Sequence, residues 1–321
     1  MENTIRNFNE QLLFKPIIEN GENFSPAESF ILCGMGGSHL SAGLAKIHDP
    51  SLSMLVHYDY GLPLVSEDRL KNSLLIASSF SGNTEETLSF AKDAHRKGLN
   101  LLSISSGGKL IEFSKKNNVP YIIIPRKDGM QPRHALGFSA CALALALSND
   151  AFSDALKKLG KNLNPESIAV GHERIVEVFK NKIPHIYASH INHALAYMWK
   201  IELNETTKIP AFFNMFPELN HNELSSFDGN LVAKEWIQNF SFLLLKDDND
   251  RPEIRKRMEI TEKLYKEKGM KVFSIELSGN SSLEKAFHSI FLCWWTALRL
   301  SQVYGVSPDD VPLIEKFKKL L

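Results

Sequence analysis

The sequence predicts an α/β protein with two domains, each a parallel β-sheet flanked by helices on both faces. Short segments that are apolar throughout alternate with helix-like segments, which is typical of strands buried on both faces. The alternation pauses near residue 150 and then restarts, and 321 residues are enough for two such domains. We therefore expect an N-terminal domain over residues 1–150 and a C-terminal domain over residues 151–321.

The first half alternates more regularly than the second. Apolar runs predict strands at residues 30–33, 53–57, 74–77, 101–104 and 121–124. The segments between and after them predict helices at residues 38–47, 84–97, 110–117 and 135–147. The last of these is apolar but too short to span a bilayer, so we expect a buried core helix.

In the second half the same reasoning predicts strands at residues 186–188, 240–245 and 271–275. Helices are expected at residues 151–159, 164–181, 190–202, 251–268, 283–303 and 309–321. Residues 204–211 and 216–223 combine carboxylates, amides and a histidine with proline punctuation, so they are expected to form a site loop and not a core element.

Composition narrows the class of protein. Lys+Arg and Asp+Glu both number 37, and without a basic excess we expect no nucleic-acid partner. No apolar run of membrane-spanning length and no signal-peptide pattern is visible, so we expect neither membrane attachment nor secretion. The three cysteines lie far apart without a CxxC pair, which favours buried free thiols in a reducing cytoplasm.

A run of small hydroxyl residues, Ser78–Thr87, follows the strand predicted at residues 74–77 and leads directly into a helix. Backbone N–H groups and hydroxyls at such a turn form a cup that suits an anion, most often a phosphate. Ser79, Ser81 and Thr84 are the candidate donors. The alternative for this run alone is an ordinary capped helix N-terminus.

A second turn of this kind, Gly34–Ser38, follows the first predicted strand. Gly36 and Gly37 would let the backbone approach a ligand, and Ser38 could donate its hydroxyl. The dinucleotide pattern GxGxxG is absent because His39 occupies the place of its third glycine. Alone this is no more than a tight turn, but two such turns on neighbouring strands would meet at the ligand-binding edge of the sheet.

Three further segments carry candidate side chains for chemistry. Arg133 lies between a strand and the core helix, where it could offset negative charge on an intermediate. In the segments at residues 204–211 and 216–223, Glu205 is a candidate general base and His221 a candidate proton shuttle. Glu218 and His221 alone are too few ligands for a metal, so no metal site is expected.

These residues together resemble the bifunctional phosphoglucose/phosphomannose isomerase family, which is built from two sugar isomerase (SIS) domains. The resemblance covers nearly the whole chain. Its markers are Gly34–Ser38, Ser79–Thr87, Pro132-Arg133, Asn204-Glu205, residues 208–211 and Phe216–Glu223. The serine-rich run is typical of SIS domains in general, whereas the Pro-Glu-Leu-Asn-His-Asn segment is specific to this family.

The resemblance implies a metal-independent aldose–ketose isomerase that interconverts glucose 6-phosphate, and also mannose 6-phosphate, with fructose 6-phosphate through an enediol(ate). Ser79, Ser81 and Thr84 would hold the phosphate, and the Gly36-Gly37-Ser38 turn would line the sugar site. Glu205 would move the proton between C1 and C2, and Arg133 would stabilise the enediolate. His221, supplied by the partner subunit of a homodimer, would open the sugar ring, assisted by Lys318. No cofactor is implied.

Two other functions stay open from the residues alone. A sugar-phosphate-binding regulator would need the hydroxyl cup but none of Glu205, His221 and Arg133. Another SIS isomerase, acting on a pentose or amino sugar phosphate, would not be expected to carry the segment around His221.

Overall fold

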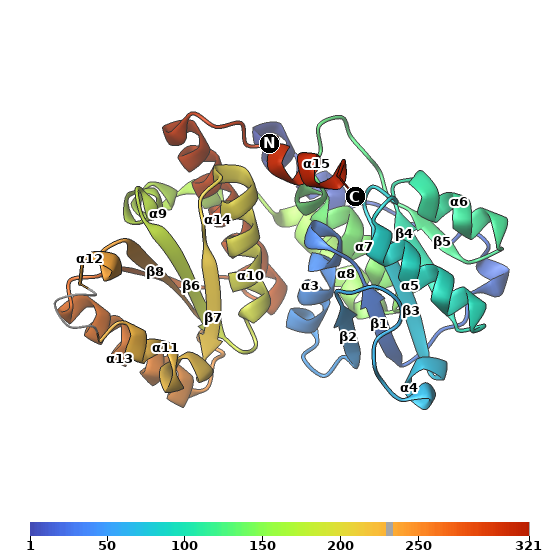
Figure 1. Cartoon of the computed structure of the whole chain (residues 1–321), viewed down its shortest axis with the longest axis horizontal. Coiled ribbons are helices and arrows are strands. Elements are labelled where there is room, and N and C mark those ends of the chain that lie inside the picture. Colours follow the sequence, from blue (N-terminus) through green and yellow to red (C-terminus); the bar gives the residue numbers. More distant parts are fainter. Residues whose placement is uncertain (229–233, 321) are drawn as a thin grey trace. The chain divides into compact units, whose positions relative to one another are not determined.

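The computed structural model describes residues 1–228 and 234–320. Its contacts divide the chain into two compact units, one comprising Asn3–Asn164 and the other Pro165–Leu321 with Met1–Glu2 (Figure 1). The pause in the sequence pattern near residue 150 marks the start of helix α8 (Asp150–Asn162), which packs against α2 (Asn9–Leu12). This packing places α8 in the first unit.

The first unit contains a five-stranded parallel sheet, in the strand order β2-β1-β3-β4-β5. Its strands are β1 (Ser29–Cys33), β2 (Met54–His57), β3 (Ser73–Ser79), β4 (Leu101–Ser105) and β5 (Tyr121–Ile123). All seven residues of β3 are buried. The sequence prediction of a parallel sheet covered on both faces is confirmed.

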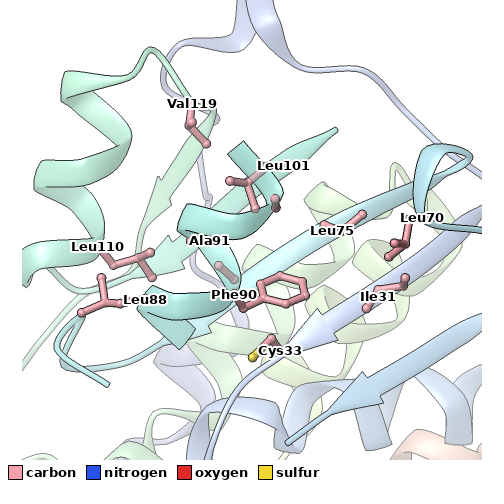
Figure 2. Packing of buried hydrophobic residues seen from close by; sticks show 12 residues of the cluster. Ile31, Cys33, Leu70, Leu75, Leu88, Phe90, Ala91, Leu101, Leu110 and Val119 are labelled. Carbon is pink, nitrogen blue, oxygen red and sulfur yellow. The ribbon is translucent and has the colours of Figure 1, made fainter. Parts of the chain in front are cut away.

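Helices cover the two faces of this sheet. On one face, Leu88 and Phe90 of α5 (Glu85–Arg96) and Leu110 of α6 (Gly108–Lys116) pack with Ile31 and Leu75 of the strands (Figure 2). The other face is covered by α3 (Leu40–His48) and α7 (Leu136–Ala146) (Figure 1). Because α7 is buried all round, it is the core helix that the sequence predicts.

The second unit contains a four-stranded parallel sheet, in the strand order β7-β6-β8-β9. Its strands are β6 (Ile183–Ser189), β7 (Phe212–Phe216), β8 (Phe240–Lys246) and β9 (Lys271–Glu276). The larger helices are α9 (His172–Phe179), α10 (His193–Glu202), α13 (Pro252–Glu267) and α14 (Ser282–Tyr304). The smaller helices of the chain are α1 (Glu2–Arg6), α4 (Glu67–Lys71), α11 (Glu223–Ser226), α12 (Lys234–Ile237) and α15 (Pro312–Lys318).

Two sequence expectations in this unit are wrong. No strand was expected between residues 204–211 and 216–223, but β7 forms there and pairs with β6. The helix expected at residues 164–181 is reduced to α9, since Gly171 adopts φ +98° immediately before it and interrupts the helical backbone. None of the helices in residues 1–228 and 234–320 is both long and apolar enough to cross a membrane.

The two sheets share one connectivity. In each, the first strand lies between the second and third, so β6, β7, β8 and β9 correspond to β1, β2, β3 and β4. The second strand lies on one side of the first and the third on the other, and open α/β sheets bind ligands at the carboxyl edge where the strand order reverses in this way. Loops after β3 and β8 are therefore equivalent places to look for a ligand.

Candidate active site

The hydroxyl run after β3 folds into a tight cup at the start of α5. Ser79 Oγ lies 2.9 Å from Thr84 Oγ1 and accepts a hydrogen bond from the backbone N–H of Gly82, with N···O 3.1 Å. Ser81 Oγ accepts from the N–H of Asn83 at 3.2 Å. The structure thus brings Ser79, Ser81 and Thr84 together at the N-terminus of a 12-residue helix, where the helix dipole favours an anion.

The loop after β1 packs against the same cup. Ser38 Oγ accepts from the backbone N–H of Phe80 at 3.0 Å, and Ser78 Oγ donates to the carbonyl of Ser38 at 2.7 Å. Ser38 therefore joins the two loops that the sequence predicted to lie on neighbouring strands. Burial lowers the pKa of the adjacent His39 to about 4, so this imidazole is neutral near pH 7.

Gly37 brings Arg133 into the same site. A Cβ atom on Gly37 would lie 2.4 Å from the backbone nitrogen of Arg133 and 2.6 Å from the carbonyl carbon of Pro132. Only glycine permits so close an approach of the two backbones. Arg133 is 2% exposed, not a surface residue, and its segment packs on the loop that carries Gly36 and Gly37.

A third loop, after β4, completes the cup. Its residues were not predicted to belong to the site. A Cβ atom on Gly82 would lie 1.8 Å from the carbonyl oxygen of Gly107, so the two loops are in backbone contact. Asn83 Oδ1 accepts from the N–H of Lys109 at the start of α6, at 3.2 Å. The Ser105-Ser106-Gly107-Gly108 sequence, which repeats the small-residue pattern after a strand, was the available signal.

The equivalent edge of the second sheet is filled by an ion-pair cluster. Lys285 Nζ, 6% exposed, lies 2.6 Å from Asp247 Oδ1 directly after β8, and it also pairs with Asp248. Asn192, after β6, donates to the other oxygen of Asp247 at 3.0 Å. Carboxylates here would repel a phosphate, so the two units differ at equivalent positions.

We expect Lys285→Met to destabilise the protein by about 3–5 kcal/mol, because it leaves the buried Asp247 carboxylate without its cation. Urea denaturation measures the change in the free energy of unfolding. Lys263→Met is the control, since Lys263 is exposed and pairs with Glu267 only at 3.8 Å. A loss below about 1 kcal/mol for Lys285→Met would contradict a stabilising role of the cluster.

Glu205 lies in a π-helical turn, Leu203–Thr207, that ends α10. The turn is held from several sides. Thr207 Oγ1 donates to the carbonyl of Leu203 at 2.5 Å, and Lys208 Nζ donates to the carbonyls of Glu205 and of Ser307, the latter at 2.8 Å. Burial, and after it the Glu205 charge, raises the pKa of Tyr197. Glu205 is half-buried in a rigid turn of the kind often found at functional sites.

His221 ends a short 3₁₀ turn, Glu218–His221, that follows β7. Its side chain is exposed, whereas Leu219 two residues earlier is fully buried. Asn222 Nδ2 donates to Glu218 Oε1 at 2.7 Å and braces the turn. An exposed imidazole on a braced turn is available to a ligand or to another protein chain.

Glu205 and His221 lie at opposite ends of the strands of the second sheet. Glu205 precedes the amino end of β7, and His221 follows its carboxyl end. The strand alone has five residues, so it separates them by about 15 Å. One chain's second unit therefore does not bring these two side chains onto one small molecule.

Lys318 ends α15 and is exposed, as are Lys316 and Lys319. The segment leading to α15 is tied to the Glu205 turn by the Lys208–Ser307 hydrogen bond at 2.8 Å. In residues 1–228 and 234–320, no group of three or more His, Cys, Asp or Glu side chains is arranged to hold a metal ion.

Comparison with known proteins connects this geometry to a family. The family model described as "Bacterial phospho-glucose isomerase C-terminal SIS domain" matches residues 172–321. A protein of Aquifex aeolicus (strain VF5), named bifunctional phosphoglucose/phosphomannose isomerase, is 32% identical over 306 residues, 94% of this chain and 92% of that protein. A protein of the same name from Caldicellulosiruptor bescii is 33% identical over 345 aligned positions, covering 100% and 98% of the two chains.

The fold is also found among solved structures. A hypothetical protein of Thermus thermophilus superposes with a TM-score of 0.70 at 18% identity, covering 99% of this chain and 86% of that one. At this identity the likeness shows the shared fold.

Proposed function

The chain belongs to the bifunctional phosphoglucose/phosphomannose isomerase family, and we propose that it interconverts glucose 6-phosphate, and also mannose 6-phosphate, with fructose 6-phosphate. The observation that carries this proposal is identity of about a third, over nearly the full length of both chains, with proteins that bear this name. The proposed place of action is the cytoplasm.

The cup in the first unit supports the assignment of the phosphate. The hydroxyls of Ser79 and Thr84 are in contact, and Ser81 lies in the same turn, at a helix N-terminus that favours negative charge. The sugar would extend from the cup toward Gly36, Gly37 and Ser38. A phosphate held there fixes the sugar without taking part in the proton transfer.

The chemistry then needs a base, an acid and positive charge near the oxyanion. Glu205 would take the proton from C2 of the open-chain aldose and return it to C1, while O1 gains a proton and the O2 hydroxyl loses one, so that the carbonyl moves to C2. The reverse transfers would serve the ketose. The electrons of the broken C–H bond form the enediolate, whose negative oxygen the Arg133 guanidinium would stabilise. Lys318 would assist ring opening. No metal or redox cofactor is needed for this sequence of proton transfers.

We assign ring opening to His221 of the partner subunit of a homodimer. The separation of Glu205 and His221 along β7 supports this arrangement, because a shared substrate requires His221 to come from another chain. The exposed position of His221 on a braced turn suits it to reach across an interface.

Turnover by the purified chain tests the proposal. We expect formation of fructose 6-phosphate from glucose 6-phosphate and from mannose 6-phosphate, with EDTA present throughout. Glucosamine 6-phosphate and a pentose 5-phosphate serve as the alternative substrates. Turnover of only an alternative substrate, binding without any turnover, or loss of activity in EDTA would each contradict the proposal.

We expect Ser81→Ala to raise KM about tenfold or more, because a hydrogen bond to a charged phosphate contributes about 1.5–3 kcal/mol to binding. Because the same hydrogen bond is also made in the transition state, its loss should leave kcat within about threefold of the wild-type value. Steady-state kinetics measure both constants. Ser51→Ala, which removes an exposed hydroxyl bonded to Asp49 at 2.5 Å, is the control. An unchanged KM for Ser81→Ala would exclude this serine from the phosphate cup.

A further inference from the structure

Glu223 makes the densest set of polar contacts around the His221 turn, and the proposed mechanism does not use it. Its Oε1 accepts from the Tyr187 hydroxyl and lies 3.2 Å from His185 Nδ1. Its Oε2 accepts from the Asn214 amide. These three partners lie on β6 and β7, so one carboxylate ties the start of α11 to two strands of the sheet.

The partners of Glu223 share one face of the sheet. Tyr187 of β6 is in register with Asn214 of β7, and His185 is in register with Phe212, two residues earlier on each strand. Side chains at alternate positions of neighbouring parallel strands point the same way, so these donors converge above a single face. His185 is also in ring contact with Phe227 and Phe242, which fix its orientation.

The other side of the turn is fixed as well. Leu219 is fully buried in the core beneath α13. Asn220 Nδ2 donates to Thr261 Oγ1 of α13 at 2.9 Å, and its Oδ1 lies 3.5 Å from Arg257. His221 is therefore an exposed residue held between anchors at positions 219, 220 and 223.

The charge state of Glu223 suits this anchoring role. Burial alone would raise its pKa, but hydrogen bonds from His185, Asn214 and Tyr187 hold the pKa of Glu223 below its ordinary value. The group is thus a carboxylate at neutral pH, with both oxygens accepting. A glutamine at this position has one carbonyl oxygen and one N–H₂ group, so it cannot accept from all three partners. If its oxygen accepts from Asn214, then Tyr187 and His185 face the N–H₂ group and must change from donor to acceptor.

We propose that Glu223 is a positioning residue that holds His221 where it can act on the sugar ring. The proposal rests on the function proposed above, in which His221 opens the ring. Its physical basis is that an error of about 1 Å in the placement of a reacting group can cost about 100-fold in rate. The phosphate cup lies in the other unit, so substrate binding should depend little on this anchor.

We expect Glu223→Gln to lower kcat about 10- to 100-fold while KM changes less than about threefold. Tyr187→Phe, which keeps the ring but removes one donor, should lower kcat in the same direction by less. Glu267→Gln, an exposed glutamate on α13, is the matched control and should leave kcat unchanged. If Glu223→Gln does not fold, Tyr187→Phe carries the same test.

A double-mutant cycle separates positioning from general stability. If Glu223 acts through His221, Glu223→Gln should change kcat less than about twofold in a His221→Ala background. An equal loss in both backgrounds would overturn the proposal, because the carboxylate would then act on the whole fold.

Amide hydrogen exchange, measured without substrate, tests the anchoring role of Glu223 independently of the proposed function. The Asn220 N–H bonds to the carbonyl of Pro217 at 3.1 Å, so its hydrogen exchange reports the order of the turn. Glu223→Gln should speed this exchange at least about tenfold, and unchanged exchange would overturn the anchor. A wild-type chain that turns over no hexose phosphate would instead refute the proposed function, and the exchange result would still decide whether Glu223 orders the turn.

Discussion

Glu205→Gln should lower kcat for glucose 6-phosphate by about a thousandfold, because a positioned general base contributes about 10²- to 10⁴-fold. The glutamine keeps the size and shape of the side chain in the Leu203–Thr207 turn but cannot take the C2 proton. The phosphate cup lies in the other unit, so glucose 6-phosphate should still bind. Coupled-assay kinetics and isothermal titration calorimetry measure turnover and binding separately.

Glu267→Gln is again the control, since Glu267 is exposed at the end of α13, and its kinetics should match those of the wild type. Turnover of Glu205→Gln within about tenfold of the wild type would remove Glu205 as the base. Loss of binding together with turnover would show that Glu205 holds the substrate and does not only move its proton.

His221→Ala should lower kcat by about 100-fold or more, because the cyclic hexose then lacks the acid–base group that opens its ring. His221 is exposed in the structure, so the alanine should cost little stability. Steady-state kinetics with glucose 6-phosphate give kcat, and thermal unfolding checks the fold.

His95→Ala provides the comparison, because His95 is exposed on α5 and its main neighbour is the Phe113 ring at 5.6 Å. Its kcat should stay within about twofold of the wild type. If His221→Ala were as active as His95→Ala, another group would have to open the ring.

The first sheet could be predicted because each of its strands contains a short apolar run, as is typical of strands buried on both faces. The cup could be predicted for a related reason. Small hydroxyl residues and glycine directly after a strand favour a tight turn, because glycine allows positive φ and the hydroxyls bond to the nearby backbone. The Ser79–Thr84 contact shows the expected convergence.

Strand β7 was missed for a physical reason. It is an edge strand, and its Phe212 is exposed while Asn214 is polar, so its residues do not form an apolar run. Proline residues on both sides also favoured a loop. Because this strand was not predicted, the sequence could not show that Glu205 and His221 lie at opposite ends of one strand.

The role of Glu223 was equally hidden in the sequence. A glutamate at the start of a short helix is explained by the helix dipole, and nothing local indicates partners 36 and 38 residues away. Tyr187 and His185, at alternate positions of one strand, gave the available signal, because polar groups on a buried sheet face need hydrogen-bond partners.

We propose that each active site is shared between two chains, and mixed dimers test this most directly. Glu205→Gln and His221→Ala chains, each nearly inactive alone, are unfolded together and refolded as an equal mixture. In a mixed dimer, one site combines the intact Glu205 of one chain with the intact His221 of the other. Random pairing should then restore about a quarter of wild-type activity, since half of the dimers are mixed and each holds one complete site. A mixture no more active than its two parents would show that both residues act within one chain or that no such dimer forms.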